Sequence, residues 1–289
     1  MNIVFFGGSS YVSRSLIDKL AKKYKIINCS RTKKKNCKNI FIDFENEKTF
    51  KNLRKIKFKQ IDLIFFFSSY VPMKEKNSTW NKCSINNIYS VINILNEINI
   101  SIKKIIHSST TSIYGSQNLQ QLKESDFLTP DTNYALTKYA QENIIRIFCN
   151  FHQIKFLSFR IGYAYDEYIN KNRLVYKLIY QLINSKKVKI KNEKKLNLNL
   201  IHTKDISKII STTMYKNEGI YNLCSVKFFS INDLINSIIN TFNLKNCKII
   251  TEKNSLHKKT NSYSMKKLSK IYDLKKISNV SENLTKFKI

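Results

Sequence analysis

The sequence predicts an α/β fold with a doubly wound parallel sheet, followed by a smaller C-terminal α/β cap. Through about the first 160 residues, short apolar runs alternate with longer segments of helical periodicity, as in repeated strand-helix-strand units. The runs are continuously apolar, which is typical of strands that helices cover on both faces. Beyond residue 162 this rhythm changes to longer helices and isolated short strands.

The first region is expected to contain strands joined by helices. The expected strands are Ile3–Phe6, Lys25–Cys29, Asn39–Ile42, Leu63–Phe67, Lys104–Ser108 and Lys155–Phe159. The expected helices, with apolar residues three and four positions apart, are Ser13–Lys23, Thr49–Lys55, Ile85–Asn99 and Asn133–Cys149. In the second region, we expect helices over Leu174–Asn184 and Ser230–Phe242, a helix from Asp205, and strands near Val188 and Leu198.

The change of rhythm also predicts a division of the chain. Residues 1–162 are expected to form the sheet domain and residues 163–289 the smaller region, with the chain free to cross between them. No linker rich in Gly, Ser or Pro separates the two. We therefore expect the smaller region to pack directly on the sheet and to close over a cleft.

The composition is that of a globular chain with a strong positive charge. Of the 289 residues, 42% are hydrophobic, and the formal charge is +31, from 51 Lys and Arg against 20 Asp and Glu. That excess alone favours a nucleic-acid or anionic-membrane partner. We interpret it as codon bias, because the lysines are spread along the whole sequence without a recognition helix, stacking motif or zinc spacing. We expect no specific nucleic-acid partner, and any DNA binding to be non-specific and weakened by salt.

Cysteine spacing and hydropathy indicate whether the chain binds a metal and where in the cell it is expected. The six cysteines are widely spaced, without a C-x-x-C pair or clustered histidines, so we expect free thiols or buried apolar side chains and no metal site. The sequence enters a strand-like run at Asn2 with no charged leader, and no stretch of about 18 apolar residues follows. We therefore expect a cytoplasmic protein without membrane association.

A candidate phosphate-binding turn, Gly7-Gly8-Ser9-Ser10-Tyr11-Val12-Ser13, lies between the first strand and the first helix. In a dinucleotide fold this position holds G-x-x-G-x-x-G, whose glycines let the backbone approach pyrophosphate at a helix N-terminus. Only the first glycine is present here. Ser10 and Ser13 occupy the other two positions, and we expect their hydroxyls to donate to phosphate. Such a turn also occurs in loops that bind nothing, so it does not decide the function by itself.

The end of the second strand bears on the choice of cofactor. An acidic side chain there accepts the ribose hydroxyls of NAD, whereas a basic one neutralises the 2'-phosphate of NADP. This chain has Ser30-Arg31 without a carboxylate, followed by Lys33–Lys35, which favours NADP, with NAD as the alternative. The alternative is that Arg31 is an ordinary exposed arginine of a basic chain, without a role in cofactor binding. Asp43, after the third strand, is expected to accept from the adenine amino group or to cap a helix.

Tyr134 and Lys138 form a candidate acid/base pair. At i and i+4 they share one helix face, so the Lys138 ammonium favours the ionised form of the Tyr134 phenol and lowers its pKa. The hydroxyl-rich segment Ser108–Ser112 ends an earlier strand, at the sheet edge where parallel sheets bind ligands. Tyr and Lys are common in this chain, so their spacing alone does not establish an acid/base site. The surrounding motifs decide whether the pair has that function.

With these motifs in order, the sequence resembles the NAD-dependent epimerase/dehydratase family, extended short-chain dehydrogenases/reductases that mostly act on nucleotide sugars. The resemblance covers nearly the full length. Besides the turn and the Tyr/Lys pair, it rests on Asp62–Ile64, Asn87–Asn93, Ser109-Thr110, Tyr114-Gly115, Glu124, Pro130, Arg160, Ile201–Asp205 and Gly219–Asn222. The chain departs from the family in two missing glycines and in Tyr163–Asp166, where the family tends to have Asn-x-Tyr-Gly.

The resemblance implies a dinucleotide-binding Rossmann domain over residues 1–162, which carries the catalytic residues, and a substrate-binding region over 163–289. It implies that Tyr134 is the acid/base, that Lys138 lowers its pKa and holds the nicotinamide ribose, and that Thr110 hydrogen-bonds the reacting oxygen. The implied cofactor-binding residues are Gly7, Ser9, Ser10, Tyr11, Val12, Arg31, Asp43, Phe67, Ser68 and Lys138. The implied substrate-binding residues are Ser69, Thr111, Arg160, Tyr163 and His202.

Within this family the sequence favours a 4-keto-sugar reductase that uses NADPH. Dehydration is disfavoured, because the family's dehydratases have an acidic pair after the catalytic threonine, where this chain has Thr111-Ser112. An NAD-dependent sugar-nucleotide 4-epimerase is the alternative. A non-catalytic nucleotide-binding protein is a further one, which the altered turn favours and the retained Thr, Tyr and Lys oppose. The expected partner is a nucleotide-sugar substrate, with a homodimer left open.

Overall fold

A computed structural model describes residues 1–72, 77–117, 119–168, 173–191, 198–226, 229–252 and 261–287. The chain divides into two compact units. Unit 1 comprises Met1–Gly115, Phe127–Ile161 and Ser207–Tyr221, and unit 2 comprises Ser116–Asp126, Gly162–Ile206 and Asn222–Ile289. The chain therefore passes from one unit to the other repeatedly.

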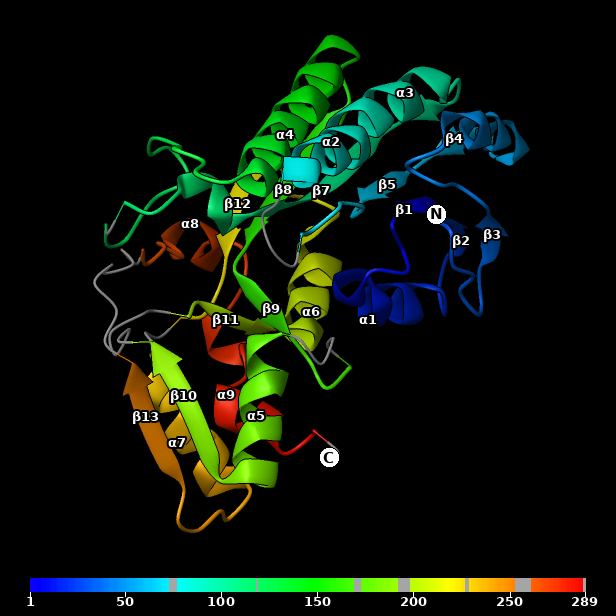
Figure 1. The fold of residues 1–289 in the computed structure, drawn as a ribbon. Coiled ribbons are helices and arrows are strands. Elements are labelled where there is room, and N and C mark those ends of the chain that lie inside the picture. The colour runs from blue at the N-terminus through cyan, green and yellow to red at the C-terminus, as the bar shows by residue number, and fades with distance from the viewer. Residues whose placement is uncertain are drawn as a thin grey trace. The chain divides into compact units, whose positions relative to one another are not determined.

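A seven-stranded sheet forms the centre of unit 1, in the order β12-β8-β7-β5-β1-β2-β3 (Figure 1). Its strands are β1 (Asn2–Phe6), β2 (Lys25–Cys29), β3 (Lys38–Ile40), β5 (Leu63–Phe66), β7 (Lys104–Thr110), β8 (Lys155–Ile161) and β12 (Gly219–Leu223). The chain runs outward from β1 to β3 and returns to β5, which pairs in parallel with the other side of β1. The strand order thus reverses between β1 and β5, where open parallel sheets bind ligands.

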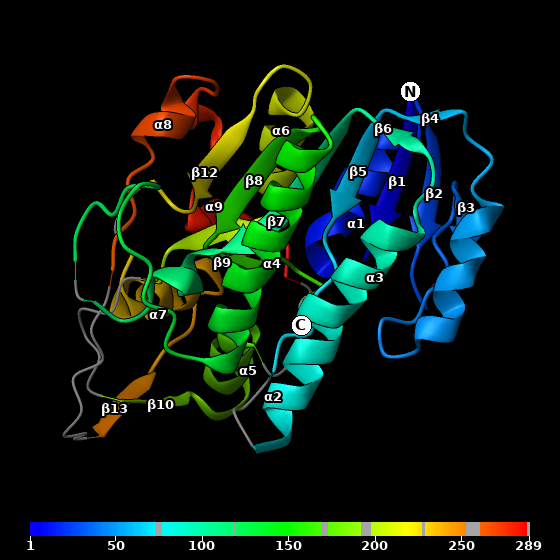
Figure 2. The same ribbon diagram turned by 90° about the horizontal axis from the view of Figure 1, so that it is seen from above.

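Helices cover both faces of this sheet (Figures 1 and 2). One face carries α1 (Tyr11–Leu20) and the unit 1 part of α6 (Thr203–Thr213), and the other carries α2 (Asn77–Ser84), a π-helical turn (Ile85–Tyr89), α3 (Ser90–Glu97) and α4 (Asn133–Phe151). All four residues of β5 are buried, as are the last four of β1 and β2. Burial on both faces explains why these strands are continuously apolar.

Shorter elements complete unit 1. They are two 3-10 helices, Glu47–Lys55 and Thr111–Tyr114, and the paired strands β4 (Gln60–Ile61) and β6 (Ser101–Ile102). The Thr111–Tyr114 turn follows β7 directly, so the hydroxyl-rich segment leaves the sheet at the carboxyl edge of that strand.

Unit 2 has its own core. Its strands are β9 (Tyr163–Tyr165) paired with β11 (Leu200–His202), and β10 (Lys187–Lys191) paired with β13 (Lys248–Glu252). Its helices are α5 (Leu174–Ser185), α7 (Ile231–Thr241), α8 (Lys266–Ser269), α9 (Val280–Leu284) and the 3-10 turn Leu274–Lys276. Apolar residues of α5 and α7, including Leu178, Leu182 and Leu234, share one buried cluster with Leu284 of α9.

The predicted fold class is confirmed, and the main errors concern element boundaries. The helix expected from Ile85 is preceded by α2, so the helical segment begins at Asn77 and contains a π-helical turn. The strand expected near Leu198 is β11, at Leu200–His202. The sequence did not predict α8, α9, β9, β12 or β13 because short elements carry little periodicity. Within the described residues, no helix is long and apolar enough to span a bilayer.

Candidate active site

The turn after β1 is held against the end of β5. Gly7 has φ +82°, and a Cβ added there would lie 2.5 Å from the backbone nitrogen of Ser68. Both the left-handed backbone and this close approach require glycine. The Gly7 carbonyl accepts from the Ser10 N–H at 3.0 Å, which closes a tight turn before α1. The first glycine is therefore fixed by the geometry of the turn.

The two serines that replace the missing glycines stabilise the turn and the helix. Ser10 is the N-cap of α1, and its hydroxyl accepts from the Ser13 N–H at 3.3 Å. Ser13 is fully buried, and its hydroxyl donates to the Gly7 carbonyl at 2.9 Å. Ser13 thus turns inward, away from the phosphate contact expected of it. Ser9, Tyr11 and Val12 are half-buried around the start of α1, whose first-turn N–H groups can receive an anion.

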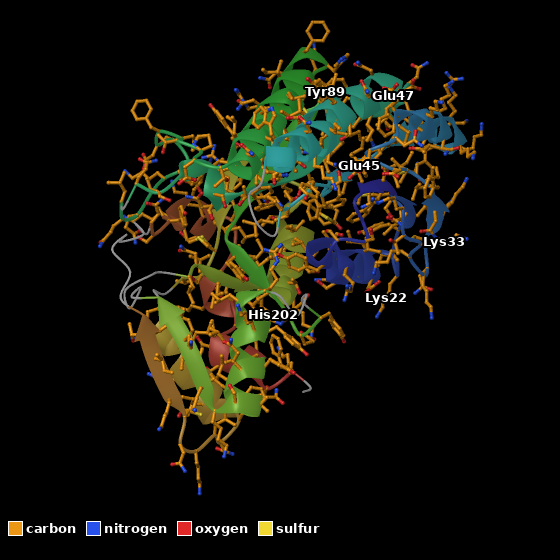
Figure 3. All side chains as sticks on the ribbon, in the orientation of Figure 1. Lys22, Lys33, Glu45, Glu47, Tyr89 and His202 are labelled. Atoms are coloured by element: carbon orange, nitrogen blue, oxygen red, sulfur yellow. The ribbon has the colours of Figure 1, made fainter. Side chains whose placement is uncertain are left out.

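The residues after β2 present an exposed cation and a fixed turn. The Arg31 side chain is 64% exposed, and its Nη1 lies 3.9 Å from the Asp43 Oδ1. Ser30 donates its hydroxyl to the Thr32 carbonyl at 2.7 Å, which orders the turn that carries Arg31. The neighbouring Lys33 is also exposed (Figure 3). This corner of unit 1 can therefore neutralise a phosphate but offers no carboxylate at position 30.

Asp43 does not cap the following helix, which was one of its two expected roles. Its Oδ1 accepts from the Glu45 N–H at 3.1 Å, while Asn46 caps the 3-10 helix by accepting from Lys48. That alternative is wrong because the helix begins at Glu47, four residues after Asp43. The adenine contact of Asp43 stays a prediction.

The end of β5 carries a buried hydroxyl that lacks a hydrogen-bond partner. Phe67 is 4% exposed and packs edge-on against Phe65, with ring centroids 5.6 Å apart. Next to it, the Ser68 hydroxyl is buried, and the described residues give it no partner. Ser69 is half-buried. Since buried hydroxyls are normally satisfied, an unpaired Ser68 beside the Gly7 turn fits a site for a polar ligand such as a dinucleotide.

The Tyr134/Lys138 pair lies on the first turns of α4. Thr132 caps this helix by accepting from the Ala135 N–H at 3.1 Å, so α4 starts one residue before Tyr134. Tyr134 is half-buried, whereas Lys138 is 1% exposed. The Lys138 ammonium donates to the Ser108 carbonyl at 2.7 Å and to the Gln141 amide oxygen. Burial lowers the pKa of Lys138 to about 7, against an opposing effect of Glu142.

Thr110 ends β7 close to this pair. It lies two residues after Ser108, whose carbonyl receives the Lys138 ammonium. The Thr110 hydroxyl accepts from the Ser112 N–H at 3.2 Å and so caps the 3-10 turn. Thr111 is 7% exposed. The structure therefore brings Lys138 to the carboxyl end of β7, at a point two residues before Thr110, with Tyr134 one helix turn earlier on α4.

A series of contacts links the glycine turn to the acid/base pair. Gly7 approaches the backbone of Ser68, and the Ser68 carbonyl accepts from the Gln141 amide at 3.5 Å. Gln141 in turn accepts from Lys138. The glycine turn follows β1, and the helix turn that carries Lys138 contacts the end of β7. Both therefore lie at the carboxyl edge of the sheet, on either side of β5. A ligand that spans this edge can touch both, as a dinucleotide does at a point of strand-order reversal.

Asn87 has a positional role that the sequence did not reveal. It is fully buried in the π-helical turn, and its amide oxygen accepts from the Tyr70 N–H at 2.7 Å. Its amide nitrogen lies 3.0 Å from the Thr137 hydroxyl of α4. Asn87 therefore ties the segment after β5 to the helix turn that carries Lys138. A polar residue in an otherwise helical apolar pattern was the available signal.

Arg160 forms an ion pair and a hydrogen bond within unit 1. It is 3% exposed, and its Nη2 and Nε lie 2.8 and 3.3 Å from the two carboxylate oxygens of Glu142. It also donates to the Tyr114 hydroxyl at 2.9 Å. These contacts tie β8 to α4 and give Arg160 a structural role. The substrate contact expected of it stays a prediction.

Tyr163 and His202 lie in unit 2. The Tyr163 hydroxyl accepts from the Leu174 N–H at 2.9 Å, at the start of α5, and burial raises its pKa. His202 is buried at the end of β11, with Nδ1 accepting from the Lys204 N–H at 3.1 Å (Figure 3). Burial lowers the pKa of His202 to about 4, so its imidazole is neutral near pH 7. Their roles toward a substrate stay predictions.

A metal site has no support here. Among the residues that the structure describes, no group of three or more His, Cys, Asp or Glu is placed to hold an ion.

Known proteins share both the sequence pattern and the fold. The dTDP-D-glucose 4,6-dehydratase of Dictyostelium discoideum is 22% identical over 268 residues, which cover 82% of this chain. The chain spans 61% of the length of that relative. The UDP-glucose 4-epimerase of Thermotoga maritima, solved with UDP-glucose, aligns with a TM-score of 0.86 at 18% identity, covering 99% of this chain and 97% of its own.

A second solved structure gives the same result. The UDP-glucuronic acid 4-epimerase of Bacillus cereus, in complex with NAD, aligns with a TM-score of 0.85 at 18% identity over 99% of this chain and 97% of its own. At such identities the likeness establishes the fold. The family model described as NAD dependent epimerase/dehydratase family matches residues 3–224, which include the glycine turn, Thr110, Tyr134 and Lys138. The chain belongs to the NAD dependent epimerase/dehydratase family.

Proposed function

We propose that the protein is an NAD(P)-dependent enzyme that transfers hydride to or from a nucleotide sugar, with Tyr134 as its acid/base. The observation that supports this proposal is the hydrogen bond from the Lys138 ammonium to the Ser108 carbonyl at 2.7 Å, which joins the helix turn after Tyr134 to the end of β7, two residues before Thr110. The Gly7 turn lies at the same sheet edge. Solved neighbours bind UDP-glucose and NAD, which supports the same ligands here.

Each residue has a distinct part in the proposed reaction. A bound nicotinamide supplies or accepts hydride at a sugar carbon. Tyr134 gives or takes the proton at the oxygen of that carbon, Thr110 hydrogen-bonds the same oxygen, and the Lys138 ammonium favours the phenolate form of Tyr134. The Gly7 turn and the start of α1 receive the pyrophosphate. Ser68, with its unpaired buried hydroxyl, is placed to bond to the cofactor.

Within this class, we propose a 4-keto-sugar reductase that uses NADP. The support is the exposed Arg31 at the end of β2, on a turn with Ser30 where a carboxylate would select NAD. A 4-epimerase with bound NAD is the second candidate, because two of the solved neighbours are 4-epimerases. Thr111 and Ser112, in place of an acidic pair, disfavour a dehydratase.

A substrate panel tests the proposed function. Purified protein is incubated with UDP-, dTDP-, GDP- and CDP-linked sugars and their 4-keto forms, each with and without NADPH. A reductase converts a 4-keto sugar only when NADPH is added, whereas an epimerase equilibrates two sugars without added cofactor. Conversion of no sugar under either condition would favour the non-catalytic alternative.

We expect NADPH to bind at least about tenfold more tightly than NADH, or roughly 1.4 kcal/mol, and Arg31→Asp to reverse that order. The physical reason is the loss of an exposed cation that faces the 2'-phosphate and the gain of a ribose-hydroxyl acceptor. Calorimetric titration with both nucleotides measures the two affinities. Arg54→Asp, at an exposed arginine of the same unit, is the matched control and should change neither. A preference for NADH in the unaltered protein would reject the NADP assignment.

We also propose that the protein forms a homodimer through the adjacent faces of the π-helical turn and α4. Tyr89 is 61% exposed (Figure 3), Ile147 is 60% exposed and Phe151 is 83% exposed. All three are large apolar side chains on adjacent helical elements, and exposed apolar side chains of this kind can mark an interaction site. The double variant Tyr89→Asp/Ile147→Asp is expected to raise the dimer dissociation constant at least about tenfold. Light scattering across a dilution series measures it, and a monomeric unaltered protein would contradict the proposal.

A further inference from the structure

A buried polar cluster, formed by Gln141 and His107, lies behind Lys138. Gln141 is on α4, one turn after Lys138, and His107 is on β7; both are fully buried. Neither belongs to the proposed reaction. A buried glutamine and histidine are costly unless they are hydrogen-bonded, so their contacts show what they stabilise.

The Gln141 amide oxygen is the common acceptor of this cluster. It accepts from the Lys138 ammonium and lies 3.0 Å from His107 Nε2. On the other side of the ring, His107 Nδ1 lies 3.1 Å from the Ser158 hydroxyl. With the proton on Nε2, the ring donates to Gln141, and its Nδ1 accepts from the Ser158 hydroxyl. That contact is favoured over the longer one, 3.4 Å, of the same hydroxyl with Glu142, and the tautomer is assigned from these contacts. His107 then donates to Gln141 and fixes its amide.

The atoms that bond directly to the Lys138 ammonium are all neutral. They are the Ser108 carbonyl and the Gln141 amide oxygen. His107 Nε2 lies 3.4 Å from the ammonium, but because it carries the proton of the ring it does not accept from it. Burial and the nearby Lys138 charge lower the pKa of His107 well below its usual value, which keeps this ring uncharged. The carboxylate of Glu142, on α4, is paired with Arg160 of β8 at 2.8 Å. Tyr134, four residues before Lys138, lies on the same helix face.

We propose that Gln141, held by His107, is a positioning residue that fixes the Lys138 ammonium beside Tyr134 without neutralising its charge. The proposal rests on the proposed function for the roles of Lys138 and Tyr134. A lysine side chain has several rotatable bonds, so two buried acceptors, the Ser108 carbonyl and Gln141, are needed to hold its nitrogen in one place. An amide serves this purpose better than a carboxylate because it accepts the hydrogen bond and leaves the positive charge available to the phenol.

The test compares two replacements of Gln141. Gln141→Met removes the acceptor at similar volume and is expected to lower kcat at least about tenfold, with KM for the sugar changed less than about twofold. Gln141→Glu keeps an acceptor but adds charge, so the pH at which kcat falls on the alkaline side should rise by at least about one unit. Asn150→Asp, an exposed amide-to-carboxylate change on the same helix, is the control and should alter neither quantity.

A second readout needs no turnover and separates this proposal from the proposed function. Because the pKa of Lys138 is lowered to about 7, the free energy of unfolding should rise with pH above that value. Gln141→Glu should flatten the rise, since a carboxylate raises the pKa of Lys138 again. If the unaltered protein converts no sugar but this flattening is seen, the contact between Gln141 and Lys138 is supported and the proposed function is rejected. Unchanged pH dependence of unfolding in Gln141→Glu, or wild-type kcat in a folded Gln141→Met, would overturn the proposal.

Discussion

Tyr134→Phe is expected to lower kcat at least about a hundredfold, the usual scale for loss of a positioned acid/base. The variant removes one hydroxyl and keeps the ring, so the affinity for the cofactor should stay within about twofold of the unaltered protein. Steady-state kinetics at saturating sugar and a calorimetric titration of the cofactor measure the two effects.

The matched control for this variant is another tyrosine of the same helix. Tyr139, five residues further along α4, is half-buried, and Tyr139→Phe should keep kcat within about twofold. Turnover in Tyr134→Phe close to that of the control would remove Tyr134 from the chemistry. The phenol would then have a purely structural part at the start of α4.

Lys138→Met should have the second largest effect, a fall in kcat of at least about tenfold together with an upward move of the pH optimum. The Lys138 ammonium favours the phenolate of Tyr134, so its removal raises the pKa of the phenol. A pH profile of kcat measures the move. A profile of unchanged shape would show that the lysine only supports the fold.

The same variant has an expected effect on stability, with a definite sign. Burial lowers the pKa of Lys138 to about 7, while in the unfolded chain a lysine stays protonated to about 10.4. Between these values the unfolded state binds more protons, so the stability of the unaltered protein rises with pH. From about pH 7 to about pH 9 the unaltered protein should gain up to about 2 kcal/mol relative to Lys138→Met. Urea unfolding of both proteins at the two pH values tests this.

The fold was predictable where burial makes a strand or helix strongly patterned. The run Leu63–Phe66, for example, is buried at every position, and such a run has few alternatives to a central strand. The segment before Ile85 was missed, because the residues of α2 are mostly polar and a π-helical turn shifts the periodicity of the helix that follows. Short elements such as α8 and β9 have too few residues for a periodic signal.

The candidate site was predictable in its motifs but not in its side-chain contacts. Spacing places Tyr134 and Lys138 on one helix face, and the resemblance gives them roles. Spacing cannot show that Ser13 turns inward to Gly7, or that Arg160 pairs with Glu142, because both depend on contacts between distant elements. Gln141 lies three residues after Lys138, yet its role depends on His107, which only the packing of α4 on β7 brings near.

The transfer of hydride from the cofactor to the sugar can be followed directly with a labelled cofactor. The protein is incubated with NADPH that carries deuterium at both C4 positions of the nicotinamide and with the sugar that the panel identifies, and the mass of the product is measured by mass spectrometry. We expect a product heavier by one mass unit, with deuterium on the sugar carbon, and no such product from Tyr134→Phe in the same time. Conversion of the sugar without deuterium in the product would contradict the reductase and favour an epimerase with tightly bound NAD. Absence of conversion and of cofactor oxidation for every sugar in the panel would contradict hydride transfer as the function of this site.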